Sequence, residues 1–388
     1  MNFINSYLQD FTNISICLIF FFILAFSSQL CLSKVKFIQR NINLPKRRSP
    51  IDGLRGYLAL LVFIHHFVLT FYWVKQGFWQ TPKELYFQNF GKVGVSIFFI
   101  ITGYLFIGKI IKNDYLINIK DLFLSRFFRV FPLYIFVTSI VFFIVFHLSG
   151  YHIVTSKLDV LSSVVRWFLF HGNEINGFDD TRRIIAGVDW TLKYEALFYC
   201  LLPFVALFLR LNKVFFSFFL SFIIFYYYFF NINFLAFNSI YFTLFLVGGW
   251  VAYYKKHLVK YIPKSVVFDI LTVMFLISSI FLFETNSLYQ ILAITFFFSS
   301  IVSGNSIFGL LRADFSLFLG EISYSIYLMH GLILFLIYKV IKIYDLIDIN
   351  FTEHLLLSPL IGLNVVIVST LTYIYIEKKW VSYGYRLR

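Results

Sequence analysis

Two ionisable residues are spaced so that they share one face of a single apolar segment, residues 51–67. Arg55 and His66 are eleven positions apart, and eleven helical residues turn through about 1,100°, close to three full turns. We therefore expect both side chains on the same side of one helix, about 16–17 Å apart along its axis. Asp52 lies one turn below Arg55 on nearly the same face, whereas His65 points about 80–100° away.

An imidazole at this depth suits acid-base chemistry. Ionisable residues within a membrane usually face a protein interior or a wet cavity, and histidine is the side chain best suited to proton transfer near neutral pH. We predict that His66 and Arg55 belong to a catalytic group. A simpler interpretation stays open for each: His66 can be a hydrogen-bonding residue between helices, and Arg55 can be a topology anchor at the membrane surface.

A pair of arginines forms the second candidate, in a segment that reads Ser-Arg-Phe-Phe-Arg-Val-Phe-Pro from residue 125 to 132. Arg126 and Arg129 are one turn apart, so both guanidinium groups can converge on one anion, and their forked donors suit phosphate oxygens. A phosphate-rich ligand such as coenzyme A would suit this pair. A basic belt that binds lipid headgroups is the alternative, and the spacing favours neither.

The third candidate begins another apolar segment and reads Val-Asp-Trp-Thr-Leu-Lys-Tyr-Glu-Ala-Leu-Phe-Tyr from residue 188 to 199. Glu195 lies inside this predicted helix, with Tyr199 one turn deeper on its face. A carboxylate there should face protein or water. It can orient the imidazole, bind a sugar hydroxyl or pair with an internal cation. We assign Glu195 to the catalytic group and place Asp189, Trp190 and Tyr199 in a substrate-binding group.

Two further motifs give weaker signals. Residues 98–104, Phe-Phe-Ile-Ile-Thr-Gly-Tyr, offer a small pair where helices can approach closely, so we expect a packing role. Residues 320–330 carry several polar groups for which we expect hydrogen bonding between helices: Glu321, Ser323, Tyr324, Tyr327 and His330. The other histidines lack metal-ligand spacing, and the three cysteines lie in apolar runs. We therefore predict neither a metal site nor a disulfide.

The solvent around all these residues must be largely lipid. Of the 388 residues, 60% are hydrophobic, 22% aromatic and 13% charged, and the mean hydropathy is +0.81. A water-soluble domain of this length needs far more polar surface. Alternating strands of a barrel are not visible. The formal charge of +14 comes from Lys and Arg between apolar runs, so membrane topology explains it better than nucleic-acid binding.

We predict an all-α integral membrane protein, a polytopic bundle of about eleven transmembrane helices. The first has no Lys or Arg before it, so we read a retained helix and no signal peptide. Basic residues after it place that loop in the cytoplasm, the N-terminus outside and the C-terminus inside. The predicted spans are 14–32, 53–73, 92–111, 130–148, 190–209, 213–230, 238–254, 265–283, 288–304, 320–340 and 355–376.

The chain divides into an extra N-terminal helix with a basic loop (1–50), a membrane domain (51–380) and a short cytoplasmic tail (381–388). No internal repeat or appended soluble domain is visible in the sequence. The longest outer segment, 149–189, is polar from residue 171 to 183. It can receive an external polar substrate, or it can be a solvated loop.

Taken together, the motifs resemble the acyltransferase-3 family of multispanning membrane acyltransferases. They occur in the family's order from about residue 51 to 380: Asp-Gly-Leu-Arg55-Gly with His66, Phe-Phe-x-x-Thr-Gly-Tyr, Arg126-x-x-Arg129, Trp-Thr-Leu-x-x-Glu195, and Ser-Tyr-Ser-Ile-Tyr-Leu-x-His330. Each motif alone is weak, whereas five in order are fairly specific. The sequence differs from the family pattern in its extra N-terminal helix and in lacking an attached esterase-like domain.

The resemblance implies a ten-helix core that moves an acyl group, commonly acetyl, from cytoplasmic acyl-CoA to a hydroxyl on a carbohydrate outside the cell's inner (plasma) membrane. It also implies that His66 and Arg55 are functional and that Arg126 and Arg129 serve acetyl-CoA or another acyl-CoA. Whether a partner protein completes the transfer stays open. A proton-coupled transporter or flippase for a sugar-containing substrate is the alternative, because buried His, Glu and Arg also suit such proteins.

Overall fold

The computed structural model describes residues 2–42, 44–211, 233–234, 237–342 and 348–387, and this part of the chain is mainly helical. Two-residue strands, β1 (Asn233–Phe234) and β2 (Phe237–Asn238), pair antiparallel. The helices are α1 (Asn2–Lys34), α2 (Lys36–Asn41), α3 (Pro50–Gln76), α4 (Leu85–Lys112), α5 (Ile119–Leu148), α6 (Lys157–Phe168), η1 (Thr181–Ile185), α7 (Asp189–Leu211), α9 (Ser239–Tyr253), α10 (Lys255–Tyr261), α11 (Val266–Phe281), α12 (Leu288–Ser303), η2 (Leu310–Arg312), α13 (Asp314–Glu321), α14 (Ser323–Phe335), η3 (Leu336–Ile341), α15 (Phe351–Leu356), α16 (Ser358–Thr372), η4 (Tyr373–Glu377) and α17 (Lys378–Arg386).

The prediction of an all-α polytopic membrane protein is confirmed. Among the described residues, 7 helical stretches are long and apolar enough to cross a membrane. Helices α10 and α11 pass the same test together but bend by 118° at their junction, while α9 and α12 are shorter apolar helices. The predicted span 213–230 lies outside the described residues. In the described part of the chain, length and composition alone thus identify seven full crossings, or eight if α10 and α11 form one span.

Two predicted boundaries were wrong. Helix α5 begins at Ile119 and not near residue 130, because the Asn118 side chain caps it by accepting a hydrogen bond from the backbone N–H of Asp121. Arg126 and Arg129 therefore lie inside a helix and not before one. The predicted span 320–340 is interrupted at Ile322, where α13 ends and α14 begins.

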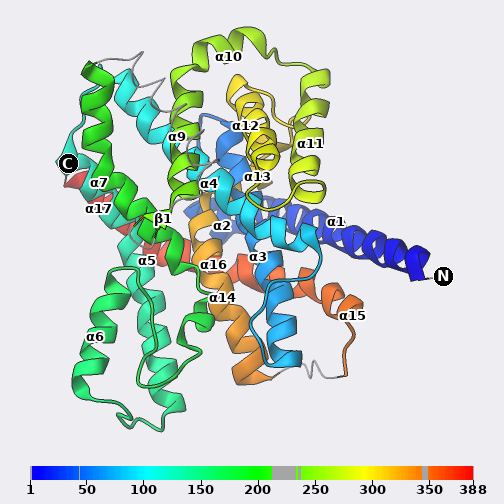
Figure 1. Cartoon of the computed structure of the whole chain (residues 1–388), viewed down its shortest axis with the longest axis vertical. Helices are drawn as coiled ribbons and strands as arrows, with labels where there is room; N and C mark the ends of the chain where they lie inside the picture. The colour runs from blue at the N-terminus through cyan, green and yellow to red at the C-terminus, as the bar shows by residue number, and fades with distance from the viewer. Residues whose placement is uncertain (1, 43, 212–232, 235–236, 343–347, 388) are drawn as a thin grey trace.

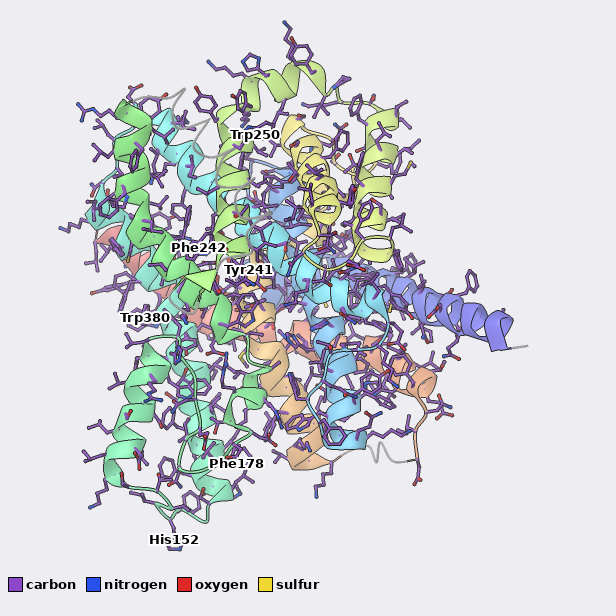
Figure 2. The ribbon with its side chains drawn as sticks, viewed as in Figure 1. His152, Phe178, Tyr241, Phe242, Trp250 and Trp380 are labelled. Carbon is purple, nitrogen blue, oxygen red and sulfur yellow. The ribbon has the colours of Figure 1, made fainter. Side chains whose placement is uncertain are left out.

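The bundle is built around α3 and α14, which lie side by side near the centre of Figure 1. Helices α4 and α13 also pack against α3, and α9 packs along α4. Helices α9, α10 and α11 form an arch beside α12 at the top of the view, while α6 and the end of α5 project at the bottom. His152 lies at the tip of this projection in Figure 2.

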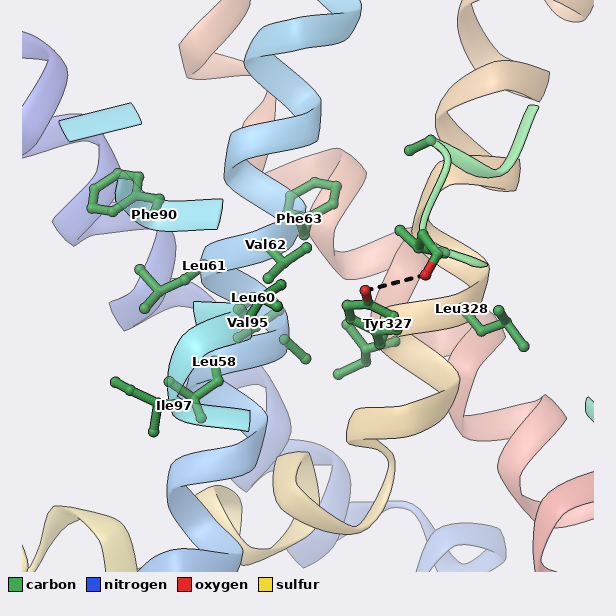
Figure 3. Packing of buried hydrophobic residues seen from close by; sticks show 14 of the residues in the cluster. Leu58, Leu60, Leu61, Val62, Phe63, Phe90, Val95, Ile97, Tyr327 and Leu328 are labelled. Carbon is green, nitrogen blue, oxygen red and sulfur yellow. Dashed lines mark hydrogen bonds between the residues drawn. The ribbon is translucent and has the colours of Figure 1, made fainter. Parts of the chain in front are cut away.

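Buried aliphatic and aromatic side chains from α3, α4 and α14 fill the centre. Leu58, Val62 and Phe63 on α3 have almost no exposed surface, and Figure 3 shows them between side chains of α4 and α14. Tyr327 on α14 lies at the edge of this cluster. Its hydroxyl is 2.8 Å from Thr191 Oγ1 and 3.3 Å from the carbonyl oxygen of Val188. These bonds fix the Tyr327 ring relative to α7.

Helices α4 and α9 approach so closely that their glycines face backbone atoms. A Cβ atom on Gly103 would overlap the carbonyl oxygen of Phe245, and one on Gly248 would overlap the carbonyl oxygen of Ile100. Small residues allow such approaches between membrane helices. The packing role predicted for the small pair is therefore confirmed for Gly103, whereas Thr102 lines a cavity.

This contact predicts different outcomes for two substitutions on α4. Gly103→Ala should lower the melting temperature and the yield of folded protein, because overpacking a rigid backbone contact typically costs about 1–3 kcal/mol. Gly108→Ala should change both little, since its Cβ would meet only the Ala252 Cβ, at 3.4 Å. Thermal unfolding in detergent compares the two, and equal melting temperatures would contradict the interpretation.

Candidate active site

A cavity of about 200 Å³ opens between α3, α4, α5, α7 and α14. Side chains of opposite charge from widely separated parts of the chain line it: Arg55, Arg126, Arg129 and Glu195. Aromatic and hydroxyl side chains complete the lining, among them Phe106, Thr191, Tyr199, Ser323, Tyr324 and Tyr327. The structure thus brings five of the site residues predicted from the sequence around a single space: Arg55, Arg126, Arg129, Glu195 and Tyr199.

Two glycines explain how Arg55 comes to face this cavity. A Cβ on Gly53 would overlap the carbonyl oxygen of Leu311, and one on Gly56 would meet Leu319 at 2.5 Å. The start of α3 therefore packs directly against η2 and α13. Arg55 lies between the two glycines in sequence, and its side chain lines the cavity on the other side.

Arg126 and Arg129 reach the cavity from α5. The Arg126 guanidinium lies over two rings that also line the cavity, 5.0 Å from the Phe106 centroid and 5.9 Å from that of Tyr199. Such stacking holds a guanidinium flat against an aromatic face. Arg129 is held differently, because its Nη2 atom lies 3.9 Å from a carboxylate oxygen of Glu377.

Glu377 is the acidic residue that the sequence analysis missed. Its side chain is only 2% exposed, and it accepts a 3.0 Å hydrogen bond from the Ser325 hydroxyl. It ends η4, a π-helical turn that interrupts the regular helix, and such turns are frequent at functional sites. The sequence does offer a signal for a functional residue here, because Glu377 is a lone carboxylate at the end of an apolar segment, just before Lys378 and Lys379. We read that segment only as the end of a span.

Glu195 faces the same space from α7. One of its carboxylate oxygens accepts a 2.7 Å hydrogen bond from the Tyr199 hydroxyl, one helical turn away as predicted. Three guanidinium groups and one carboxylate therefore line the cavity. Within the described residues, the buried Arg126 Nε and Ser323 Oγ atoms have no hydrogen-bond partner. Unused donors and excess positive charge suit an anionic ligand with hydrogen-bond acceptors.

His66 lies further along α3, on the face that it shares with Arg55 by spacing. Its Nδ1 atom is 2.9 Å from Nε2 of His330 on α14. The side chain keeps some accessible surface, whereas His330 is fully buried. The neighbouring His65 is tied elsewhere, with its Nδ1 2.8 Å from the carbonyl oxygen of Phe87 on α4.

The partners of the two histidines define their tautomers. The other ring nitrogen of His330, Nδ1, lies 3.0 Å from the carbonyl oxygen of Ile326. A carbonyl oxygen only accepts, so this nitrogen carries the proton, and in a neutral ring Nε2 then has the lone pair. That lone pair accepts a hydrogen bond from Nδ1–H of His66. Nε2 of His66 is therefore left as the unprotonated nitrogen, which can accept a proton or attack a carbonyl carbon.

Comparison with known protein families gives a match over most of the chain. A family model described as an acyltransferase domain matches residues 49–376. The chain belongs to the acyltransferase-3 family. That match includes α3, α5, α7 and α14, which carry the cavity and both histidines.

Three curated relatives illustrate the similarity of this family member. It is 29% identical over 165 residues to the putative peptidoglycan O-acetyltransferase YrhL of Bacillus subtilis. The aligned residues make up 39% of the chain and 23% of the relative. The chain is 29% identical over 177 residues to the peptidoglycan O-acetyltransferase OatA of Listeria monocytogenes, covering 42% and 25%. A putative O-acetyltransferase of Staphylococcus aureus is 25% identical over 169 residues, with coverage of 42% and 25%. The matches thus span about a quarter of these relatives, and no solved structure matches significantly.

Two residues predicted for substrate binding in this acyltransferase-3 protein lie away from the cavity lining. Asp189 is fully buried, accepts a 3.0 Å hydrogen bond from the backbone N–H of Gly172 and pairs with Arg182 at 3.2 Å. Trp190 packs its ring against Tyr241, with 4.8 Å between centroids. Tyr199, the third, lines the cavity. A direct contact of Asp189 or Trp190 with substrate stays a prediction.

Tyr327 connects the cavity with the histidines. It lines the cavity, and its ring centroid is 6.1 Å from that of His330. On the other side, the Trp79 ring is stacked toward His66 at 6.3 Å. His66 itself does not line the cavity; Tyr327 and His330 connect it to the lining, and Trp79 of the loop that follows α3 packs against its ring. Among the described residues, no group of three or more His, Cys, Asp or Glu is arranged to hold a metal ion.

Proposed function

We propose that the protein transfers an acyl group, in the first place acetyl, from cytoplasmic acyl-CoA to a hydroxyl of a cell-envelope carbohydrate. The observation that carries the proposal is the joint placement of a cation-lined cavity and an imidazole with an unprotonated Nε2 in one bundle. Membership of an acyltransferase family supports the reaction, and relatives named as peptidoglycan O-acetyltransferases support the acceptor class. The family match favours this reaction over transport or flipping of a sugar-containing substrate.

In the proposed reaction, Arg126 and Arg129, with Arg55 nearby, hold phosphate oxygens of the donor through charge-assisted hydrogen bonds. The thioester end is directed toward His66. Nε2 of His66 takes the proton of the acceptor hydroxyl as its oxygen attacks the thioester carbonyl, and the thiolate of CoA leaves. Attack by Nε2 itself, with an acyl-imidazole intermediate, is the second route that the same nitrogen permits.

His330 acts in this scheme as a positioning residue. When Nε2 of His66 gains a proton, the ring becomes a cation whose Nδ1–H stays hydrogen-bonded to Nε2 of His330. That bond fixes the ring orientation and stabilises the charge, the role that the third residue plays in nucleophile–base–orienter triads.

This role predicts opposite outcomes for two substitutions of His330. His330→Leu should lower kcat by about 10–100-fold, as is typical when an orienting partner is lost, and leave KM for acetyl-CoA unchanged. His330→Gln offers an amide oxygen that can accept from His66, so it should recover much of the loss. Steady-state kinetics of both variants in nanodiscs checks this. Equal kcat values for the two variants would show that the rate does not depend on residue 330 accepting a hydrogen bond from Nδ1–H of His66.

The activity itself is tested with the protein reconstituted into sealed proteoliposomes, whose membrane separates two compartments. Acetyl-CoA labelled in the acetyl group is supplied on one side, and peptidoglycan fragments or other envelope polysaccharides on the other. We expect label to enter the glycan as an ester that mild alkali releases. If CoA is released but none of the envelope polysaccharides becomes labelled, the proposed transfer is contradicted.

The envelope location and orientation belong to the same proposal. We place the protein in the inner (plasma) membrane, with the N-terminus outside and the basic C-terminal end in the cytoplasm, on the positive-inside rule. This orientation exposes the arginine side of the bundle to cytoplasmic acyl-CoA. A partner protein that hands the acetyl group to the glycan is compatible with it.

A further inference from the structure

A second concave surface lies apart from the cavity lined by Arg55 and Glu195, where α2 meets the C-terminal helix. It is a groove of about 640 Å³ between α2 and the helix formed by η4 and α17. The N-terminal wall contributes Phe37 and Asn41, while the C-terminal wall contributes aromatic and basic residues, including Tyr375, Lys379, Tyr383 and Arg386. We call this surface the terminal groove.

The walls of the terminal groove are joined by a specific contact. The Lys378 ammonium donates a hydrogen bond to the carbonyl oxygen of Asn41, which ties α17 to α2. Phe37 and Tyr375 rings lie 6.3 Å apart across the same boundary. Apart from Ile374 and Tyr375, the lining residues fall outside residues 49–376, the part that matches the family model. The groove is therefore built largely by segments outside that match.

Both walls lie where a membrane span ends. The span that includes α1 ends at Lys34, and α2 follows directly. On the other side, the interval between Glu353 and Glu377 contains no charged residue and is about the length that a helix needs to cross the hydrocarbon layer. Lys378 and the residues after it are thus expected at headgroup level. Trp380 on α17, labelled in Figure 2, is 46% exposed, as is typical of aromatic residues at this interface.

The two chain segments that form the terminal groove carry only basic charges, of which Arg48, outside the groove lining, pairs with Asp314 at 2.8 Å. No Asp or Glu occurs between Asp10 and Asp52 or after Glu377, whereas six Lys or Arg lie in residues 34–48 and four in residues 378–388. Glu377 does not compensate them, because its buried carboxylate is turned to Ser325 and Arg129. The Lys379 ammonium lies 5.5 Å from the Tyr375 ring centroid. Cations beside exposed aromatic rings at a membrane surface suit an anionic headgroup.

We propose that the terminal groove binds the headgroup of an anionic phospholipid. The phosphate would be held by Lys379 and Arg386, and the hydroxyls of Ser382 and Tyr383 can bind the remaining headgroup oxygens. The acyl chains would lie along the apolar sides of α1 and α16. A bound lipid of this kind would link the N-terminal helix to the acyltransferase-3 part of the chain, beside the η4 turn that carries Glu377 toward Arg129.

The proposal is tested by native mass spectrometry of the purified, delipidated full chain titrated with phosphatidylglycerol or phosphatidylcholine. We expect a tightly retained phosphatidylglycerol adduct and no equivalent phosphatidylcholine adduct. The double variant Lys379→Gln, Arg386→Gln should bind phosphatidylglycerol about 30-fold more weakly, since each basic residue near a membrane surface strengthens lipid binding about fivefold. Lys379→Arg, Arg386→Lys should retain the adduct.

A matched control removes the same charge elsewhere. Lys256 and Lys260 are exposed on α10, another basic helix, and Lys256→Gln, Lys260→Gln should leave the adduct intact. Equal weakening in both double variants would show that net charge alone controls binding and would overturn the site. Displacement of the lipid by acetyl-CoA would also overturn it, because the groove would then take donor phosphates. Thermal unfolding verifies that every variant is folded. Because the lipid adduct is measured by mass spectrometry, the result does not depend on whether the protein transfers acetyl groups.

Discussion

His66→Ala is expected to lower the rate of acetyl transfer by about 10²–10⁴-fold, the usual contribution of a positioned general base. The expectation follows from the network in which Nδ1 of His66 donates to His330, and His330 donates to the carbonyl oxygen of Ile326. Nε2 of His66 is the nitrogen that this network leaves unprotonated. Membranes containing equal amounts of each variant, supplied with labelled acetyl-CoA, give the comparison.

His65 supplies the matched control for this experiment. It precedes His66 in the chain, but its Nδ1 is bound to the carbonyl oxygen of Phe87. His65→Gln keeps a donor for that carbonyl and should retain most of the activity. Full O-acylation by the His66→Ala protein would remove His66 from the mechanism, and equal losses in both variants would indicate a packing role for the pair.

Arg126→Gln is expected to raise KM for acetyl-CoA by about 10–100-fold, because hydrogen bonds to charged groups each contribute about 1.5–3 kcal/mol. The Arg126 guanidinium already lies 5.0 Å from the Phe106 ring centroid and 5.9 Å from that of Tyr199, and its buried Nε has no hydrogen-bond partner among the described residues. Initial rates at varied acetyl-CoA measure the effect. The preference among acceptor glycans should not change, and an unchanged KM would reject the phosphate-binding role.

Arg129 needs a compensated variant, because its loss leaves a buried carboxylate without its cation. Arg129→Gln should destabilise the protein as well as weaken donor binding, since the buried Glu377 carboxylate would lose the guanidinium that lies 3.9 Å from it. The double variant Arg129→Gln, Glu377→Gln should recover the melting temperature but keep the high KM. Recovery of KM together with stability would assign Arg129 a structural role alone. Lys260→Gln, distant from the cavity on α10, controls for the change in net charge.

Much of the site could be predicted from the sequence because it depends on helical spacing. The interval between Arg55 and His66 and the one-turn separations of Arg126 from Arg129 and of Glu195 from Tyr199 are properties of single helices. The structure places Arg55, Arg126, Arg129 and Glu195 around one cavity. The all-α membrane fold likewise follows from hydropathy alone.

The missing part depends on contacts between distant helices. His66 and His330 are 264 residues apart, so no local pattern pairs them, although both residues were noticed. Glu377 lies at the end of the π-helical turn η4, 3.9 Å from Arg129 of α5, and a hydropathy pattern shows neither the turn nor the contact. The predicted start of α5 was wrong for a related reason, since the Asn118 cap extends the helix beyond its apolar part.

The account depends on one geometric claim, that the donor's acyl end meets Nε2 of His66 while its phosphates lie on Arg126 and Arg129. A cryo-EM structure of the protein in nanodiscs with a non-hydrolysable acetyl-CoA analogue measures this directly. We expect the phosphates beside the two arginines and the acyl carbon about 3–3.5 Å from Nε2, the separation of a productive encounter. An analogue bound with its acyl end directed away from His66, or outside this cavity, would contradict the account.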